Sequence, residues 1–370
     1  MEFRQGPVEG VEVNREFWKG KKVLVTAHTG FKGSWLSLWL QSLDAEVIGY
    51  SLSVPTNPSL FYLAEVGNKM ETLWGDVRDF TSLKGFIVAR HPTIIFHMAA
   101  QPIVRQSYLD PIETYSTNVM GTVNLLEAVR QAGGVKAVVI ITSDKCYENK
   151  EVLRGYCEDD RLGGYDPYSS SKGCAEFVTA AFRHSFFNPG NMDHHGTALA
   201  SARAGNCIGG GDWASDRLIP DIMRALFEGQ QVLIRYPNSV RPWQHVLEPI
   251  RGYLMVAEKL AAGADAAASG WNFGPDRHDE RAVIEVAEAV VKALGKGRIR
   301  IEDSGADLHE AKLLRLDCTR ARVELGWVPA LRFQDCIRLT ADWYGDWATG
   351  RPAAEICRDQ IAEYEGMFSK

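Results

Sequence analysis

Short apolar runs and stretches with helical spacing alternate along the first two hundred residues. Residues 22–26 (Lys-Val-Leu-Val-Thr) are apolar and rich in β-branched side chains, which predicts a buried strand. Residues 34–43 then space their leucines as a helix does, and residues 45–50 return to the strand pattern. A strand, a helix and a strand in this order predict a parallel pair joined by a right-handed crossover.

The alternation continues as far as residue 204. Further helices are predicted at 81–90, within 111–133 and at 167–187, and further strands at 93–98, 137–142 and 198–204. Strands that alternate with helices over this length favour an α/β fold with a Rossmann-type, doubly wound parallel sheet.

The pattern changes after Asn206. Gly209-Gly210-Gly211 opens an irregular stretch in which short strands and helices are mixed with Pro and Trp. We therefore expect an irregular N-terminal lead-in over residues 1–20 and a dinucleotide-binding domain over 21–206. Residues 207–370 should form a smaller, mainly substrate-binding lobe, with some segments that return to the main sheet.

Composition and charge narrow the class of protein. The chain is 45% hydrophobic and 24% charged, which is ordinary for a globular protein. Its net charge of −6 excludes a general attraction to nucleic acid or anionic membranes. No apolar run approaches the roughly 20 residues that span a bilayer, and the first residues do not resemble a signal peptide. The 7 cysteines show no C-x-x-C spacing, which favours reduced thiols in the cytoplasm.

Adjacent histidines at 194 and 195 do not predict a metal site. Neighbouring side chains point apart, and the sequence places no third ligand near them. We expect no metal.

A glycine-containing turn follows the first predicted strand. Its spacing is G-x-x-G-x-x-G with Ala27 in the place of the first glycine, and such turns bring backbone and a helix N-terminus to a dinucleotide pyrophosphate. An alanine fits there only if its φ stays negative. A structural turn without a ligand is the alternative. The predicted cofactor-binding residues of this turn are Ala27, His28, Thr29, Gly30, Phe31, Lys32 and Gly33.

The end of the second predicted strand leaves the choice between NAD and NADP open. A ribose-binding carboxylate is expected about 20 residues after the turn, but residues 49–53 read Gly-Tyr-Ser-Leu-Ser, and no arginine stands there either. Asp76 could contact the adenine, or it could cap the helix that begins near Thr81.

Tyr168 and Lys172 lie four residues apart on a predicted helix, and so on one face. An ammonium beside a phenol lowers the phenol's pKa, and the phenolate can take a proton from a substrate hydroxyl. The spacing alone is weak, but Ser143, Asp144 and Lys145 directly follow a buried strand, whose carboxyl end should face the same crevice. Taken alone, Ser-Asp-Lys could be a helix cap beside a solvated charge.

The Ser143-Asp144-Lys145 segment and the helix with Tyr168 and Lys172, together with residues 97–101 and 117–122, resemble the extended short-chain dehydrogenase/reductase family. The resemblance covers nearly the whole chain. Within it the chain is similar to the nucleotide-sugar 4,6-dehydratase branch. Four segments resemble the subgroup that acts on CDP-D-glucose: residues 29–36, 144–149, 209–213 and 241–246. The preference for CDP comes from this resemblance and not from the physics of the residues.

The resemblance implies an NAD-dependent lyase. The sugar is oxidised at C4, water is lost across C5 and C6, and the hydride returns to C6. Two alternatives are a dehydratase or 4-epimerase acting on another nucleotide sugar, and, more distantly, a non-catalytic dinucleotide-sensing protein. A plain 4-epimerase needs no acid at C6, so Asp144 favours the dehydratase.

The resemblance also implies roles for the catalytic residues. Tyr168, with its pKa lowered by Lys172 and the nicotinamide charge, takes the C4 hydroxyl proton. Ser143 holds the C4 oxygen where relatives carry Thr. Asp144 protonates the leaving oxygen, which requires desolvation. Lys145 stands where relatives carry a Glu base, so either it acts when neutral or another residue takes the C5 proton.

Further binding residues are implied in the same way. The remaining cofactor-binding set is Asp76, Val77, Ala99, Ala100, Gln101, Asn118, Tyr168 and Lys172, in which Asn118 either supports a proton path to Lys172 or is an ordinary helix-interior residue. The substrate-binding set is Gln101, Arg105, Asn206, Trp213, Arg217, Arg235, Arg241 and His245. Arginines suit a diphosphate, whereas Trp213 could equally be lobe core. In the resembled family the two long helices at 111–131 and 167–187 pair across a two-fold axis, which implies a homodimer or a larger homo-oligomer.

Overall fold

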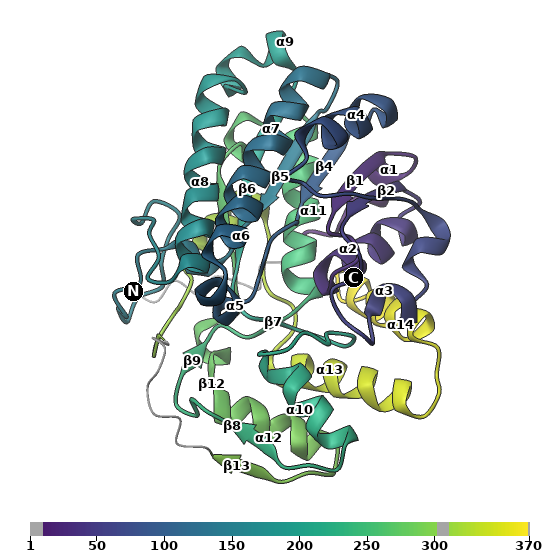
Figure 1. Cartoon of the computed structure of the whole chain (residues 1–370), viewed down its shortest axis with the longest axis vertical. Coiled ribbons are helices and arrows are strands. Elements are labelled where there is room, and N and C mark those ends of the chain that lie inside the picture. Colours follow the sequence, from purple (N-terminus) through teal and green to yellow (C-terminus); the bar gives the residue numbers. More distant parts are fainter. Residues whose placement is uncertain (1–9, 302–310, 369–370) are drawn as a thin grey trace.

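The computed structural model describes residues 10–301 and 311–368, and its centre is a seven-stranded sheet in the order β11-β6-β5-β4-β1-β2-β3 (Figure 1). Neighbouring strands all pair in parallel. The strands are β1 (Lys22–Thr26), β2 (Glu46–Ser51), β3 (Glu71–Trp74), β4 (Ile94–His97), β5 (Ala137–Ile141), β6 (Ala198–Ala204) and β11 (Gly270–Phe273). This confirms the predicted doubly wound sheet. The pattern did not predict strand β3. Strand β11 lies within residues 207–370, the part from which segments were expected to return to the main sheet.

The winding reverses at β1. Val23 pairs with Val47 of β2 on one side and with Ile94 of β4 on the other. The chain runs outward from β1 to β2 and β3, and then crosses back to begin the other half at β4. In open α/β sheets, ligands bind outside the carboxyl ends of the strands at such a switch point.

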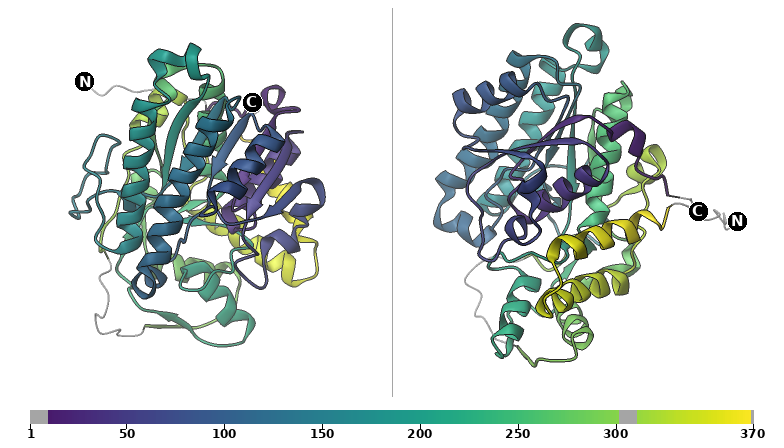
Figure 2. Two further views of the ribbon diagram at one scale, coloured as in Figure 1. Left: turned by 45° about the horizontal axis from the view of Figure 1, so that its top comes forward. Right: turned by 90° about the vertical axis from the view of Figure 1, so that its right-hand side faces the viewer.

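One face of the sheet is covered by helices α4 (Phe80–Arg90), α7 (Gly121–Ala132) and α8 (Pro167–Ser185), which lie side by side in Figures 1 and 2. The helix predicted within residues 111–133 is interrupted. It consists of α6 (Pro111–Tyr115), the π-helical turn η2 (Ser116–Met120) and α7. Such π turns often occur at functional sites, and this one carries Asn118.

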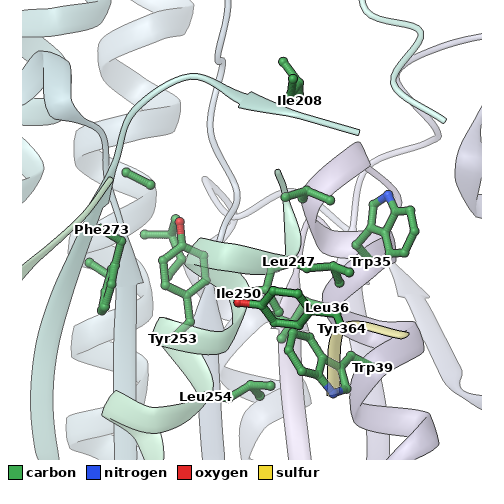
Figure 3. Packing of buried hydrophobic residues seen from close by; sticks show 14 of the residues in the cluster. Trp35, Leu36, Trp39, Ile208, Leu247, Ile250, Tyr253, Leu254, Phe273 and Tyr364 are labelled. Atoms are coloured by element: carbon green, nitrogen blue, oxygen red, sulfur yellow. The ribbon is translucent and has the colours of Figure 1, made fainter. Parts of the chain in front are cut away.

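The opposite face packs against α2 (Phe31–Ser42) and α11 (Leu247–Ala261). Figure 3 shows Trp39 of α2 near Leu254 of α11, whereas Trp35 lies further along α2, and all three side chains are buried. Each fully buried apolar side chain of this size contributes roughly 2–3 kcal/mol relative to an exposed one. This packing fixes α2, and with it the glycine turn, against the sheet.

The C-terminal half adds a lobe below the carboxyl ends of the strands (Figure 1). Its helices are α10 (Leu218–Phe227), α12 (Val283–Ala293), α13 (Phe333–Ala348) and α14 (Ala353–Glu365), and α14 returns to pack on α2 (Figure 2). Three two-stranded sheets join β7 (Cys207–Ile208) to β10 (Gln244–His245), β8 (Val232–Ile234) to β13 (Ile299–Ile301), and β9 (Val240–Arg241) to β12 (Arg281–Ala282).

Four short helices complete the fold: α1 (Arg15–Trp18), α3 (Leu60–Leu63), α5 (Val104–Leu109) and α9 (Met192–His195). The lead-in, of which residues 1–9 lie outside the described part, was expected to be irregular. That expectation is wrong for α1, because Asn14 caps this helix and Trp18 is buried in the core. Within the described ranges, no helix is both long and apolar enough to cross a membrane.

Candidate functional site

The glycine turn presents the N-terminus of α2 to the carboxyl edge of the sheet. Gly30 is the N-cap of α2, and no side chain caps the first turn, so its N–H groups are open to a ligand. A Cβ on Gly33 would lie 2.2 Å from the Ala27 carbonyl oxygen, so only glycine allows the close approach of turn and helix. These residues fit a dinucleotide pyrophosphate.

Ala27 corrects one expectation. Its φ is +54°, in the left-handed region, and not negative as predicted. The cause is the tightness of the turn, in which the Gly30 N–H donates to the Ala27 carbonyl at 3.1 Å. A non-glycine residue in this region is disfavoured by about 1–2 kcal/mol, which the surrounding packing offsets.

The His28 side chain points into the fold rather than into the crevice. It is fully buried, its Nε2 lies 3.0 Å from Thr72 Oγ1, and a Cβ on Gly49 would lie 2.4 Å from its ring. Burial lowers the pKa of His28 to about 4, so the ring is neutral. The imidazole therefore packs between β1, β2 and β3.

Asp76 does not cap α4. Asp79 does so, accepting from the Ser82 N–H at 3.0 Å. Asp76 instead pairs with Arg78, whose Nε donates to Asp76 Oδ2 at 2.8 Å. The buried Val77 side chain packs beneath Gly121 of α7, where an added Cβ would lie 2.7 Å away.

A cavity of about 350 Å³ opens at the carboxyl ends of the strands, between the sheet and the lobe. It is lined by β5 and β6 ends on one side and by α10, β8 and β9 on the other. Ten residues predicted from the sequence line it together: Lys32, Arg105, Ser143, Asp144, Lys145, Tyr168, Asn206, Arg217, Arg235 and Arg241. These residues come from distant parts of the chain, so the fold assembles a single polar site.

The Tyr168 phenol and the Lys172 ammonium respond to burial in opposite directions. Burial raises the pKa of Tyr168 to about 12, although the adjacent Ser143 hydroxyl lowers it in part. Burial and the charge of Lys32 lower the pKa of Lys172 to about 8, and its Nζ donates to the Ile141 carbonyl at 3.3 Å. The expected lowering of the phenol pKa is therefore not produced by these protein groups alone.

The Asp144 carboxyl is buried, with an exposed fraction of 2%. Its Oδ1 accepts a hydrogen bond from Ser143 Oγ at 2.9 Å, while its Oδ2 has no hydrogen-bond partner among the described residues. Burial raises the pKa of Asp144, and Lys145 opposes this in part. Burial thus shifts this carboxyl toward its protonated form, and its Oδ2 is available to a ligand in the cavity.

Gln101 and Asn118 are engaged with each other near the carboxyl end of β4. Asn118 Oδ1 accepts from the Gln101 N–H at 2.8 Å, and Asn118 Nδ2 donates to Ser171 Oγ of α8 at 2.8 Å. Gln101 Nε2 donates to Thr114 at 2.9 Å. The loop that follows β4 is anchored to β1, because the Ala99 N–H donates to Thr26 Oγ1 at 3.0 Å. Ala100 is the next residue of this loop. Asn118 thus joins this loop to the Tyr168 helix.

Two predicted substrate contacts are wrong. Trp213 does not line the cavity but packs edge-on against Tyr344 and Trp347, with ring centroids 5.4 and 5.1 Å apart. His245 is fully buried against Trp35, and burial lowers its pKa to about 3. Both residues belong to the core where the lobe joins the sheet, which is the alternative stated for Trp213.

The histidines at 194 and 195 end α9, and His195 Nε2 lies 2.9 Å from the Asn188 carbonyl.

Sequence reasoning missed part of the cavity wall. The start of α10 and the strand β8 contribute Leu218, Pro220, Leu233 and Ile234. No local signal marks these residues, because their position depends on how the lobe folds back. It also missed that Lys32 of the glycine turn reaches the same cavity as Asp144.

The fold and the site define an extended short-chain dehydrogenase/reductase of the nucleotide-sugar epimerase and dehydratase class. The family model described as GDP-mannose 4,6 dehydratase matches residues 24–340. The chain belongs to this family, which confirms the predicted resemblance.

The chain is 52% identical to the CDP-glucose 4,6-dehydratase of Salmonella typhimurium over 352 residues, covering 95% of this chain and 98% of that protein. It is 29% identical to a dTDP-glucose 4,6-dehydratase of Streptomyces griseus over 68% of this chain and 71% of the relative. Among solved structures, the dTDP-glucose 4,6-dehydratase DesIV of Streptomyces venezuelae, with NAD and TYD bound, superposes with a TM-score of 0.76 at 23% identity, over 90% of this chain and 99% of DesIV.

Proposed function

We propose that this protein dehydrates CDP-D-glucose to CDP-4-dehydro-6-deoxy-D-glucose and water, with NAD+ as a cofactor that is regenerated in each cycle. One observation carries the proposal: a buried carboxyl with a free oxygen, Asp144, lies beside Ser143 and Tyr168 in one cavity. The 52% identity to a CDP-glucose 4,6-dehydratase supports the choice of substrate. NAD+, when bound, accepts the C4 hydride and later supplies it to C6.

Tyr168 removes the C4 hydroxyl proton. The Ser143 hydroxyl lies next to the phenol and holds the C4 oxygen. Since burial raises the phenol pKa to about 12, the proton can leave readily only when a positive charge stands near the ring. Lys172 and the glycine turn of α2 would hold the cofactor, and its oxidised nicotinamide would supply that charge.

Asp144 protonates the C6 hydroxyl as it leaves. Its burial raises its pKa above the ordinary value, which is the direction that a general acid needs. Lys145 lines the cavity next to it. Lys145 either takes the C5 proton in its neutral form or positions the sugar for another base.

Arginines that line the cavity bind the diphosphate: Arg217, Arg235 and Arg241 of the lobe, and Arg105 of α5. Arg217 Nη1 lies 3.1 Å from Asp212, and Arg105 and Arg235 share Asp216 at 3.6 and 3.3 Å. These aspartates hold the guanidinium groups at the cavity wall, and a diphosphate would add charge-assisted hydrogen bonds. Asn206, at the end of the first domain, and Arg241 of the lobe also line the cavity. Because most of the arginines come from residues 207–370, this part acts mainly as the substrate-binding lobe and residues 21–206 as the dinucleotide-binding domain.

A direct assay tests this function. The purified protein is incubated with NAD+ and, in parallel, with the CDP, dTDP, UDP and GDP forms of glucose, and products are identified by mass spectrometry. We expect a product lighter by one water from CDP-glucose, formed at least about tenfold faster than from the other three. A product of unchanged mass would indicate epimerisation and contradict the proposal.

We further propose a homodimer in the cytoplasm. Exposed apolar side chains gather on α5, α6, η2 and α8, where a second copy would cover them: Leu109, Ile112, Tyr115, Met120 and Phe177. The helices α6 and α7 follow one another along the chain and both pack against α8, so two copies could pair them across a two-fold axis (Figure 1).

A further inference from the structure

A buried ion pair lies directly behind the cavity. Glu176 of α8 and Arg203 of β6 are 3% and 5% exposed, and Arg203 Nη2 donates to Glu176 Oε2 at 2.8 Å. Ser201 Oγ donates to the same oxygen at 2.7 Å. Burial pushes the pKa of Glu176 upward, but Arg203 and the hydrogen bonds outweigh it and hold the pKa below its usual value. Glu176 is therefore a carboxylate.

The pair holds both ends of the turn that carries Asp144. Glu176 Oε1 accepts a hydrogen bond from Thr142 Oγ1, and Thr142 immediately precedes Ser143. Arg203 Nη1 donates to the Tyr147 hydroxyl at 2.7 Å, just after the turn. Tyr147 in turn donates to Asn272 Oδ1 of β11 at 2.7 Å. The short helix η3 (Asp144–Cys146) is thus anchored on each side.

The same pair connects this turn to the catalytic helix. Glu176 lies four residues after Lys172 and eight after Tyr168, so all three occupy one face of α8. Neither Glu176 nor Arg203 lines the cavity, so neither can touch a ligand there. Their only route to the chemistry is through the residues that they hold.

We propose that Glu176 and Arg203 are positioning residues that keep the Asp144 turn aligned with Tyr168. The inference rests on the proposed function. After the C4 hydroxyl has lost its proton and the C4 carbon its hydride, Asp144 must meet the C6 oxygen of the same sugar. A displacement of about 1 Å can slow such a step roughly 100-fold. A loosened turn should leave oxidation nearly intact and delay loss of water.

The kinetic test compares Glu176→Gln and Thr142→Val with Thr142→Ser, which keeps the hydroxyl. We expect water loss to slow about 100-fold in the first two variants, with KM for CDP-glucose changed less than about threefold. Absorbance of reduced nicotinamide should then build up during turnover. Thr142→Ser should behave as the wild type. Equal slowing in Thr142→Ser and Thr142→Val, or unchanged water loss in Glu176→Gln, would overturn the proposal.

Glu248→Gln is the matched control. Glu248 is another buried carboxyl, 1% exposed, which accepts from Tyr364 at 2.7 Å on α14, and it does not line the cavity. This variant should lower overall stability without slowing water loss relative to oxidation. If it produced the same build-up, general destabilisation would explain the effect and the proposal would fail.

Hydrogen exchange of the backbone gives a second result that does not depend on turnover. The Lys145 N–H donates to Ser143 Oγ at 3.2 Å and the Cys146 N–H to the Ser143 carbonyl at 3.2 Å, so these amides should be protected. Exchange in the peptide 142–147 should be at least about tenfold faster in Glu176→Gln and Thr142→Val, and unchanged in Glu248→Gln. Unaltered exchange would contradict the positioning role. If the wild-type protein did not turn over CDP-glucose, the proposed function would fail. The exchange rates would still show whether Glu176 and Thr142 hold the Asp144 turn in place.

Discussion

At the scale of single residues, burial shifts the pKa values of two catalytic groups in the same direction, with opposite consequences for their roles. Burial raises the pKa of both Tyr168 and Asp144. For Asp144 this is useful, because an acid must retain its proton until the C6 oxygen leaves. For Tyr168 it is unfavourable, because a base must lose its proton. The phenol therefore depends on a positive charge brought by the cofactor, whereas the carboxyl does not.

Replacing Tyr168 with Phe removes only the hydroxyl. We expect kcat to fall roughly 1,000-fold, since general base catalysis contributes about 100- to 10,000-fold. The free energy of unfolding, measured with urea, should change by less than about 0.5 kcal/mol because the ring still packs. Activity within tenfold of the wild type would remove the role given to Tyr168.

Replacing Asp144 with Asn should separate stability from activity. The folded-state pKa of Asp144 is raised above its ordinary value of 3.8, so the folded state binds the proton more tightly than the unfolded state. Wild-type stability should thus decline, relative to the variant, as pH rises above about 4. Urea unfolding at acidic and neutral pH measures this difference in stability. In the same variant, water loss should slow by about 100-fold or more. Parallel stability profiles would contradict the burial of a free carboxyl.

At the scale of elements, the glycine turn and α2 act as one unit. The turn closes because Ala27 adopts a left-handed conformation and because Gly33 lets the helix approach it. Trp35, whose ring centroid lies 6.1 Å from that of His245, and Trp39, whose ring centroid lies 5.7 Å from that of Tyr364, then hold the helix N-terminus at the carboxyl edge. Binding of a pyrophosphate depends on this arrangement more than on any one side chain.

The substitution Gly33→Ala tests whether the glycine turn and α2 depend on their close approach. The added Cβ would lie 2.2 Å from a backbone oxygen, so we expect a destabilisation of about 1–3 kcal/mol and weaker NAD+ binding by calorimetry. Gly85→Ala is the control, because a Cβ there meets nothing within 4 Å in α4. That variant should be stabilised by about 0.4–1 kcal/mol and bind NAD+ normally. Normal binding by Gly33→Ala would refute the close approach.

The elements that could be predicted are those whose signal is local. The apolar runs of β1 and β5 and the helical spacing of α8 are local signals for these elements. Ala27 directly follows β1, Ser143 lies two residues after β5, and Tyr168 is the second residue of α8. The lobe could not be predicted in this way, because β7 to β10 are two or three residues long and pair with distant segments. For the same reason Trp213 and His245, which share the segments of true cavity residues, were assigned to the substrate although tertiary packing buries them.

The sequence contained a pattern from which the buried ion pair of Glu176 could have been predicted. A charged residue that continues the Tyr168 and Lys172 face of a helix cannot be solvated if that face is buried. It must find a partner, and Arg203 in the otherwise apolar strand β6 is the complementary exception.

At the scale of the whole molecule, the cavity needs both parts of the chain. The sheet supplies Asp144 and Tyr168, and the lobe supplies Arg217 and Arg241. The exposed apolar surface of α6 and α8 lies on the opposite side of the helical layer from the sheet, so a second copy could cover it without blocking the cavity.

Charge introduced at this surface should separate the copies. In Ile112→Lys and Phe177→Lys, side chains that are 81% and 58% exposed would carry a cation into the proposed interface. We expect sedimentation to show a monomer, because a buried unpaired charge is strongly unfavourable at an interface. Val323→Lys, at a site 77% exposed in the lobe half, is the control and should remain dimeric. Dimers in all three variants would place the interface elsewhere.

The most direct test of the central claim follows a single hydrogen. CDP-glucose carrying deuterium at C4 is converted by the protein with unlabelled NAD+, and the position of the label in the product is read by NMR. Oxidation, elimination and hydride return within one site predict that the deuterium moves to C6 of the same molecule. Deuterium that stays at C4, or that is lost to solvent, would contradict the account.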